Sequence, residues 1–365
     1  MKKILIVLGT RPEAIKLISI IKELKKDEEN FEVILCTTGQ HREMVRELLH
    51  EFDIVSEYDL NIMQHSQTLN HITTFVMNKI TTVITIERPD YVMVQGDTTS
   101  AMAAALAAFN SKIPVVHVEA GLRTYDIQQP YPEEANRRII SLLTQIHFAP
   151  TYLNWNNLRN ERIVDKNIHV VGNTGIDLLL EMDDEPELLD KTILITIHRR
   201  ENLPHLEQIC EAIRELAELH PEIKFLFCVH PNPQILSTVI KILQKPNIEI
   251  LIAPGYKKFV SYMKQCYFII TDSGGVQEEA SVLCKPVLVV RNKTERVESL
   301  RAGVSKLVGV TKSKIIKVTQ ELLTNAELYK KMSRKNDDLY GNGTAAKRIC
   351  EVLKNEQSRQ SNPMG

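Results

Sequence analysis

The chain has 365 residues, more than one ordinary hydrophobic core supports, so its length favours two domains. Hydrophobic residues make up 43% of the chain and charged residues 25%, a balance that is typical of a globular protein and gives no indication of disorder. Lys and Arg (45) nearly balance Asp and Glu (46), so no overall basic field indicates a nucleic-acid partner or an anionic membrane surface.

Short runs of apolar and β-branched residues alternate with helical patterns along the whole chain. Buried strands separated by helices predict an α/β fold with parallel sheets covered on both faces. An acidic segment, residues 181–187, has the composition of a linker, and we place a hinge at about 172–190. We predict strands over residues 4–8, 31–36, 91–95, 114–118, 168–171, 192–196, 224–229, 248–252, 268–271 and 287–290, and a last helical pattern over 345–353.

The sequence carries no clear signal for secretion or for a membrane. The apolar run at residues 4–8 is shorter than the roughly seven to fifteen residues of a signal peptide's apolar core. No run approaches the roughly 20 apolar residues of a membrane-spanning helix. The six cysteines form no CxxC pair and are typical of small buried side chains in a reducing compartment. We therefore expect a cytoplasmic protein.

Because ligands of parallel α/β sheets bind beyond the carboxyl ends of the strands, the loops at those ends are the candidate site. The first is GTRPEAIK, residues 9–16. Arg11 and Lys16 lie about one helical turn apart near a helix N-terminus, which favours a phosphate group. A capped helix with two solvated cations is the alternative.

The second loop is TDSGGVQEE, residues 271–279, directly after an apolar run. Gly274 and Gly275 let backbone N–H groups approach an anion, Ser273 adds a hydroxyl donor, and Glu279 can accept hydrogen bonds from a ribose. The alternative is a glycine turn whose acidic residues complement the helix dipole. Neither loop matches GxGxxG or a Walker motif, so we expect no dinucleotide cofactor and no ATP.

Three carboxylates follow predicted strands or open a predicted helix in the first half: Asp97, Glu119 and Glu133. Together they can supply the base and the acid of a proton-transfer reaction. Taken singly, Asp97 can be a helix cap and Glu133 a partner of the helix dipole.

In the second half His198 precedes two arginines at a strand end, which suits a leaving phosphate. These acids and histidines leave a metal site conceivable, but HExxH and Cys/His pairs at ligand spacing are absent, so we expect none.

These loops, in this order, resemble the nonhydrolysing UDP-N-acetylglucosamine 2-epimerase family, and the resemblance covers about residues 4–350. The family implies a glycosyltransferase-B fold, in which two Rossmann-like domains surround a central cleft and a C-terminal helix packs back on the first domain. The domains would comprise residues 1–172 with the helix at about 343–355, which carry the catalytic carboxylates, and residues 173–342, which bind UDP. The matching segments are GTRPE (9–13), TGQH (38–41), QGDT (95–98), HVEAGLRT (117–124), PEEANR (132–137), HRREN (198–202), HPNP (230–233), DSGGVQEE (272–279) and TER (294–296).

The resemblance also implies a role for individual residues. The catalytic group would be Asp97, Glu119, Glu133 and His198. The substrate-binding group would be Arg11, Lys16, Arg137, Phe259, Ser273, Gly274, Gly275, Glu279 and Arg296. A second UDP-N-acetylglucosamine, acting as activator, would contact Gln40, Glu43, Arg199, Glu201 and His230. The chain departs from the pattern in three places: Glu43 and Ser66 stand where many members have Gln and Arg, and the segment 253–259 lacks a glutamine near the uracil.

The reaction that the resemblance implies is reversible epimerisation of UDP-N-acetylglucosamine at C2, through elimination and re-addition of UDP with a 2-acetamidoglucal intermediate. It requires no metal and no cofactor, and the family suggests a homodimer. Three alternatives stay open: a hydrolysing epimerase that releases N-acetylmannosamine and UDP, a glycosyltransferase of the same architecture, and a nucleotide-sugar-binding regulator without turnover.

Overall fold

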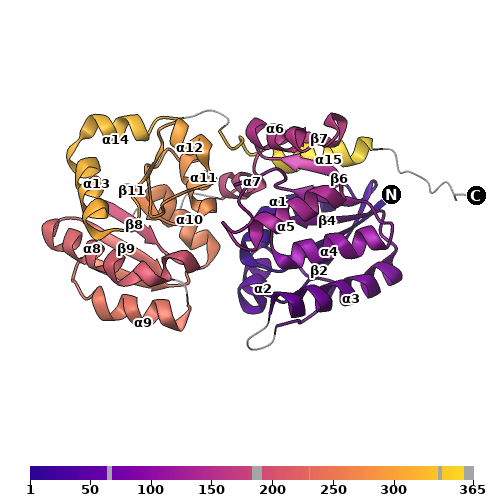
Figure 1. Ribbon diagram of the computed structural model, residues 1–365, viewed down its shortest axis with the longest axis horizontal. Coiled ribbons are helices and arrows are strands. Elements are labelled where there is room, and N and C mark those ends of the chain that lie inside the picture. The colour runs from indigo at the N-terminus through magenta and orange to yellow at the C-terminus, as the bar shows by residue number, and fades with distance from the viewer. Residues whose placement is uncertain (64–67, 183–190, 230, 336–338, 357–365) are drawn as a thin grey trace, which may run out of the picture. The chain divides into compact units, whose positions relative to one another are not determined.

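The computed structural model describes residues 1–63, 68–182, 191–229, 231–335 and 339–356. The chain divides into two compact units (Figure 1). The first comprises Met1–Glu181 and Tyr340–Gly365, and the second comprises Met182–Leu339. Most of the predicted linker, residues 183–190, lies outside the described residues.

The first unit has a parallel sheet at its centre. Among the described residues this sheet has seven strands in the order β3-β2-β1-β4-β5-β6-β7. The strands are β1 (Lys2–Leu8), β2 (Phe31–Thr37), β3 (Tyr58–Asp59), β4 (Tyr91–Gln95), β5 (Val115–Val118), β6 (Thr144–Ala149) and β7 (Ile168–Val170). Residues 4–8 of β1 are fully buried, as expected for a central strand covered on both faces.

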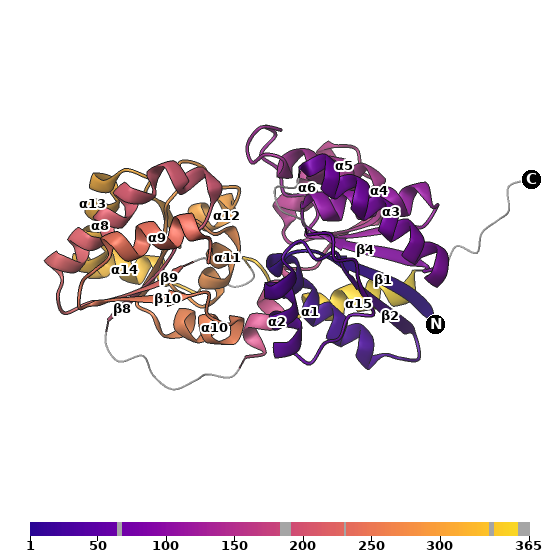
Figure 2. The same cartoon turned by 90° about the horizontal axis from the view of Figure 1, so that it is seen from below.

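Helices cover both faces of this sheet. In Figure 2, α3, α4 and α5 lie on one face and α1, α2 and α15 on the other. The helices are α1 (Arg11–Lys26), α2 (Arg42–Glu51), α3 (Leu69–Glu87), α4 (Thr99–Asn110), α5 (Glu133–Leu143), α6 (Tyr152–Asn160), α7 (Thr174–Leu180) and α15 (Ala345–Asn355), with a 3₁₀ turn at Asp165–Asn167.

Helix α15 comes from the far end of the chain and packs on α1 and α7 of the first unit. The carboxylate of Asp177, in α7, accepts hydrogen bonds from the backbone N–H groups of Ala345 (3.2 Å) and Ala346 (2.6 Å). These groups are two of the donors that the start of a helix leaves without an intrahelical acceptor. Because α7 caps α15 in this way, the first unit extends to Glu181, beyond the boundary expected at residue 172.

The second unit also has a parallel sheet, with the strand order β10-β9-β8-β11-β12-β13 among its described residues. Helices α8, α9 and α13 pack together on one face, over Phe225 and Phe227 of β9. Its strands are β8 (Thr192–Thr196), β9 (Lys224–Val229), β10 (Ile248–Ile252), β11 (Phe268–Thr271), β12 (Val287–Val289) and β13 (Ser305–Leu307). Its helices are the 3₁₀ helix η2 (Arg200–His205), α8 (Leu206–Leu219), α9 (Pro233–Ile242), α10 (Tyr256–Gln265), α11 (Gly274–Val282), α12 (Val297–Arg301), α13 (Lys312–Thr324) and α14 (Ala326–Met332).

The expected fold class is confirmed: both units are doubly wound α/β sheets, and the C-terminal helix packs on the first. In each sheet the strand order reverses next to the unit's first strand, between β1 and β4 and between β8 and β11. This switch point is where open α/β sheets bind ligands. The loops that follow these four strands are therefore the first places to look for a site.

Three strands were not predicted from the sequence: β3, β6 and β13. Strand β3 has two residues and β13 has three, which is too short for a recognisable pattern. In β6 the polar residues Thr144, Gln145 and His147 interrupt the apolar run, although His147 is fully buried. Within the described ranges, no helix is long and apolar enough to cross a membrane.

Candidate active site

The turn between β1 and α1 is held by a buried carboxylate. The side chain of Glu13 is 2% exposed, and its Oε2 accepts hydrogen bonds from the backbone N–H groups of Gly9 (2.8 Å) and Thr10 (2.6 Å). Its other oxygen accepts a hydrogen bond from the hydroxyl of Thr98 (2.7 Å), which follows β4. Burial raises the pKa of Glu13 above its ordinary value, and these three donors oppose the shift. Glu13 thus ties together the loops on the two sides of the switch point.

The loop after β4 presents Asp97, which is held by Arg137 of α5. Both Nε (2.8 Å) and Nη2 (2.7 Å) of Arg137 contact the same oxygen of Asp97, Oδ2. The amide of Asn136 donates to the backbone carbonyl of Asp97 (2.9 Å). Among the described residues, the second carboxylate oxygen, Oδ1, makes no hydrogen bond or ion pair. The Asp97 side chain is 27% exposed, so this oxygen can accept a hydrogen bond or a proton from a ligand.

The loop after β5 presents Glu119, which contacts a cation and an amide. Lys16 of α1 forms an ion pair with Oε1, and the side-chain amide of Gln95 donates to Oε2. Glu119 has a φ of 67°, in the left-handed region that few non-glycine residues adopt. Such conformations cost of order 1–3 kcal/mol and gather at functional sites, where the surrounding structure enforces them.

The turn that carries Asp97 is supported from β5 by His117, which is 1% exposed. Its Nε2 lies 2.8 Å from the carbonyl oxygen of Gly96 and carries the proton of this hydrogen bond, because a carbonyl only accepts. Burial lowers the pKa of His117 to about 3, so the ring stays neutral at physiological pH.

The other predicted residues of the first unit occupy different positions. Glu133 opens α5 and Arg11 opens α1, both half-buried. Gln40 accepts a hydrogen bond from the hydroxyl of Ser100, which lies in α4 (2.8 Å). Glu43 is exposed in the first turn of α2, and its side chain makes no hydrogen bond or ion pair with any described residue. Gln40 is thus held at the strand ends of this unit, whereas Glu43 faces solvent.

In the second unit a fully buried carboxylate, Asp272, organises the loop after β8. It accepts hydrogen bonds from the backbone N–H groups of His198 (3.1 Å) and Arg199 (2.9 Å) and from the side-chain amide of Asn202 (2.9 Å). The Nδ1 atom of His198 lies 3.6 Å from Asp272 Oδ1, and 37% of the His198 side chain is exposed. Asp272 therefore fixes the backbone of the loop that carries the exposed side chain of His198.

The loop after β11 leads into the N-terminus of α11, with Ser273 as its N-cap. A Cβ atom built on Gly274 would lie 2.6 Å from the guanidinium carbon of Arg296, so a larger residue at this position would displace the Arg296 side chain. A Cβ atom on Gly275 would meet nothing within 4 Å. No packing contact requires a glycine at Gly275, and the open space above it lies at a helix N-terminus, where anions bind.

Two further residues of the second unit were expected near a nucleotide. Glu279 of α11 is 7% exposed, and its Oε1 accepts a hydrogen bond from the hydroxyl of Tyr256 (2.8 Å). Tyr256 opens α10 and is itself buried, so it holds this carboxylate in one orientation. Phe259 lies one turn further along α10 and is half-buried.

Arg296 is held against Gly274 by two carboxylates. Its Nε contacts Glu278 at 2.9 Å and its Nη1 contacts Glu295 at 2.5 Å, and the side chain is 9% exposed. This geometry makes Arg296 a support of the α11 N-terminus.

The residues expected to bind an activator divide between the two units, with Arg199 and Glu201 in the second. Glu201 pairs with Arg291 at 2.6 Å, and Arg199 lies 3.6 Å from Glu295. His230 lies outside the described residues. No group of three or more His, Cys, Asp and Glu placed to hold a metal ion occurs in the part of the chain that the structure describes.

Several residues that organise these loops were not singled out from the sequence. Glu13 could have been predicted, because Thr10 and Glu13 have the Thr-x-x-Glu spacing of a helix capping box. The others act through contacts between segments that are distant in the sequence, which a motif does not reveal. They are Gln95, His117 as a support, Glu134, Tyr256, Asp272, Glu278 and Glu295.

The chain has two doubly wound units. One has carboxylates at its strand ends, and the other has a helix N-terminus of the kind that binds anions. This arrangement places the chain in the class of glycosyltransferase-B-type α/β proteins. A glycotransferase of kitacinnamycin, 12% identical with a TM-score of 0.67, shares the fold alone. The chain belongs to the UDP-N-acetylglucosamine 2-epimerase family, whose model matches residues 22–354. The family resemblance seen in the motifs is thereby confirmed.

Relatives match the chain over almost its full length. The UDP-N-acetylglucosamine 2-epimerase of Campylobacter jejuni is 44% identical over 99% of both chains. The enzyme of that name from Escherichia coli K12 is 44% identical over 97% of this chain and 99% of its own. The crystal structure of the Neisseria meningitidis enzyme bound to UDP-GlcNAc has a TM-score of 0.91 at 43% identity, covering 96% of this chain and 99% of that one. S. aureus MnaA with UDP has a TM-score of 0.92 at 40% identity, covering 97% and 96%.

Proposed function

We propose that this protein interconverts UDP-N-acetylglucosamine and UDP-N-acetylmannosamine by inverting C2 of the sugar, without hydrolysing either. Membership of the epimerase family supports the reaction and the substrate. The observation that carries the proposal lies in the first unit. Asp97 and Glu119, at neighbouring strand ends, are each held by a cation, while Asp97 keeps one oxygen available to a ligand.

The chemistry explains why such groups are needed. The hydrogen at C2 has no adjacent carbonyl to acidify it, so direct removal of the proton is slow. When the C1–O bond to UDP breaks, positive charge develops at C1 and the C2 proton becomes removable. Loss of both gives 2-acetamidoglucal and UDP, and return of the proton to the other face of C2 with re-addition of UDP to C1 completes the inversion. A base, an acid and a site for the leaving diphosphate suffice.

The first unit supplies the acids and bases in this proposal. Asp97, Glu119 and Glu133 are the proton-transfer groups, and Lys16 and Arg137 balance their charge. Carboxylates whose positions are fixed before the substrate binds lose little freedom in the transition state, which is the source of rate enhancement by preorganisation.

The second unit binds the nucleotide in this proposal. The N-terminus of α11 with Ser273 and Gly275 receives the diphosphate, and Glu279, oriented by Tyr256, accepts hydrogen bonds from the ribose. His198 lies on a loop whose backbone is held by Asp272, and we assign it the role of donating a proton to the departing phosphate oxygen.

The experiment that tests retention of UDP is proton NMR of the protein with UDP-N-acetylglucosamine as the only sugar nucleotide. We expect UDP-N-acetylmannosamine to appear and reach a constant ratio with the substrate, and free UDP to stay at trace level. Accumulation of free N-acetylmannosamine with an equal amount of UDP would instead identify a hydrolysing epimerase. Turnover that requires an added acceptor would identify a glycosyltransferase.

We also propose that UDP-N-acetylglucosamine activates the enzyme at a second site that includes Gln40, Arg199 and Glu201. The support for this site is the resemblance of the segments that carry these residues to the family. In the structure the side-chain oxygen of Gln40 accepts a hydrogen bond from Ser100, and Glu201 pairs with Arg291. Glu43 is exposed and acidic where many members carry Gln, so the affinity for an anionic activator is expected to be weak. The test compares initial rates with UDP-N-acetylmannosamine alone and with a small addition of UDP-N-acetylglucosamine. Equal rates would rule activation out.

A further inference from the structure

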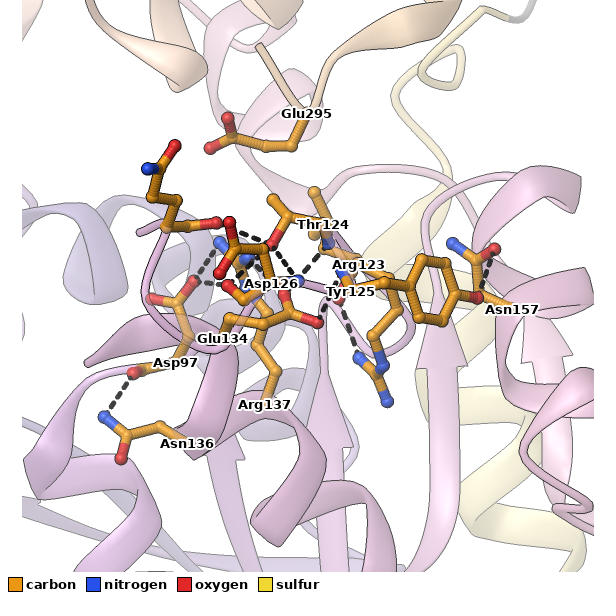
Figure 3. A network of polar contacts seen from close by, with 12 residues as sticks. Asp97, Arg123, Thr124, Tyr125, Asp126, Glu134, Asn136, Arg137, Asn157 and Glu295 are labelled. Atoms are coloured by element: carbon orange, nitrogen blue, oxygen red, sulfur yellow. Dashed lines mark hydrogen bonds and ion pairs between the residues drawn. The ribbon is translucent and has the colours of Figure 1, made fainter. Parts of the chain in front are cut away.

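Glu134, the second residue of α5, is a fully buried carboxylate that the proposed chemistry does not use. It has three partners. Oε2 accepts hydrogen bonds from the backbone N–H of Thr124 (3.0 Å) and from Nη1 of Arg137 (3.1 Å), and Oε1 accepts one from the backbone N–H of Tyr125 (3.1 Å). Figure 3 shows Glu134 between these groups, with Asp97 on the far side of Arg137.

A buried ion pair is weak evidence for a role in stability, because removing two charges from water costs about as much as their attraction returns. What the carboxylate provides is orientation, since the guanidinium of Arg137 is planar and its donors point in fixed directions. One edge, Nε and Nη2, contacts Asp97, and the remaining nitrogen, Nη1, contacts Glu134.

The two contacts fix Arg137 from opposite sides. With Glu134 in place, the guanidinium cannot turn in its plane without breaking a hydrogen bond, so Asp97 Oδ2 is held and Oδ1 is presented in one direction. The same carboxylate also holds consecutive N–H groups of the loop that begins at Glu119. Tyr125, in that loop, has a φ of 61°, a left-handed conformation that needs such support.

We propose that Glu134 is a positioning residue for the epimerisation, which acts through Arg137 on Asp97. This inference rests on the proposed function. The distinction from a purely structural role is that loss of Glu134 changes the chemical step and leaves nucleotide binding by the second unit unaltered. A displacement of about 1 Å at a reacting group can cost about 100-fold in rate. In the proposed function the groups that bind UDP are Ser273, Gly275 and Glu279 of the second unit, so loss of Glu134 should leave the affinity for UDP unchanged.

The test is Glu134→Gln, which keeps the size of the side chain and removes its charge. We expect kcat to fall by about 10-fold to 100-fold, with KM for UDP-N-acetylglucosamine and the Kd for UDP within about three-fold of wild type. The matched control is Glu161→Gln. Glu161 pairs with the buried Arg123 of the same loop at 2.7 Å but does not contact Arg137. The variant should therefore lose stability, because a buried charge loses its partner, while its kcat stays within about three-fold of wild type.

A double-mutant cycle separates a positioning role from a general loss of structure. If Glu134 acts through Arg137, the pair Glu134→Gln with Arg137→Gln should be no slower than Arg137→Gln alone. Should Glu134→Gln fail to fold, Glu134→Asp provides the same comparison with the charge retained. An unchanged kcat in the variant that folds, or additive effects in the cycle, would overturn the inference. Absence of epimerisation by the wild-type protein in the same assay would count against the proposed function instead.

Discussion

The two units have the same arrangement of strands around their switch points but place different groups there. In the first unit, the strand-end carboxylates are partly exposed: the Asp97 side chain is 27% exposed and the Glu119 side chain 11%. In the second unit, the strand-end carboxylate Asp272 is fully buried and accepts backbone hydrogen bonds, and the exposed groups are His198 and the N-terminus of α11. One topology therefore supports proton transfer in one unit and anion binding in the other, because the fold fixes only where the loops lie.

The largest expected effect comes from removing the proposed proton-transfer groups of the first unit. Asp97→Asn and Glu119→Gln each keep the shape of the side chain and remove its ability to exchange a proton. We expect kcat to fall by about 10²-fold to 10⁴-fold, the range typical of a lost general acid or base. The Kd for UDP, measured by calorimetry, should stay within about three-fold, because the proposed function assigns the diphosphate and ribose to Ser273, Gly275 and Glu279 of the second unit. Unchanged rates would refute the catalytic assignment.

A substitution in α11 tests whether the second unit binds the diphosphate. Gly275→Ala introduces a methyl group that no described atom of the protein approaches within 4 Å. Alanine also favours a helix over glycine by up to about 1 kcal/mol, so the free energy of unfolding should stay equal or rise slightly. If a diphosphate occupies the space above Gly275, its affinity should fall by about 10-fold to 100-fold, equivalent to an overpacking cost of about 1–3 kcal/mol. Wild-type affinity for UDP would show that the diphosphate binds elsewhere.

The third prediction concerns the pH dependence of stability through His117, which supports the turn that carries Asp97. The folded-state pKa of His117 is about 3, below the unfolded value of about 6.5, so the unfolded chain binds a proton first as the pH falls. The stability that this residue contributes is therefore complete above about pH 6.5 and decreases as the pH falls towards 3. Between pH 7.5 and pH 5 the loss should be about 2 kcal/mol.

His117→Gln is the matched variant for this titration, because glutamine has an amide donor to replace Nε2 and no titrating group near neutral pH. Urea unfolding at the two pH values should show the acid-induced loss reduced by about 2 kcal/mol in the variant. Equal losses in the wild type and the variant would mean that other groups cause the acid sensitivity.

The smallest expected effect tests how the second unit orients its ribose carboxylate. Tyr256→Phe removes the hydroxyl that donates to Glu279 and leaves the ring in place. The loss of one hydrogen bond to a carboxylate should lower the free energy of unfolding by about 1–2 kcal/mol. The Kd for UDP should rise by about three-fold to ten-fold, while kcat at saturating substrate stays near wild type. A variant with reduced kcat and normal affinity for UDP would place Tyr256 in the chemistry rather than in binding.

The sequence was informative where a function depends on neighbouring residues. The switch-point loops could be located because each follows a continuous buried strand, and the acids and glycines in them could be given chemical roles. The sequence was less informative where a polar residue is buried inside a strand. Strand β6 was missed because His147 interrupts its pattern, although burial lowers the pKa of this histidine to about 4 and the ring is accommodated as a neutral group.

The supports of the site could not be predicted for a different reason. Asp272 follows β11, whereas the loop that it holds follows β8. Glu134 belongs to α5, and its backbone partners belong to the loop after β5. Both carboxylates look like ordinary acidic residues in a motif, and only the fold shows that they are buried and what they hold. Arg296 differs again, because its charge is already balanced by two carboxylates that the motif does not relate to it.

The measurement that tests the central claim most directly is deuterium exchange at C2. The wild-type protein is incubated in heavy water with UDP-N-acetylglucosamine as the only sugar nucleotide, and C2 is followed by NMR. Removal and return of a proton through the carboxylates of the first unit predicts deuterium at C2 of both sugar nucleotides, with the exchange slowed by about 10²-fold to 10⁴-fold in Asp97→Asn or Glu119→Gln. Formation of UDP-N-acetylmannosamine with hydrogen fully retained at C2 would contradict the account.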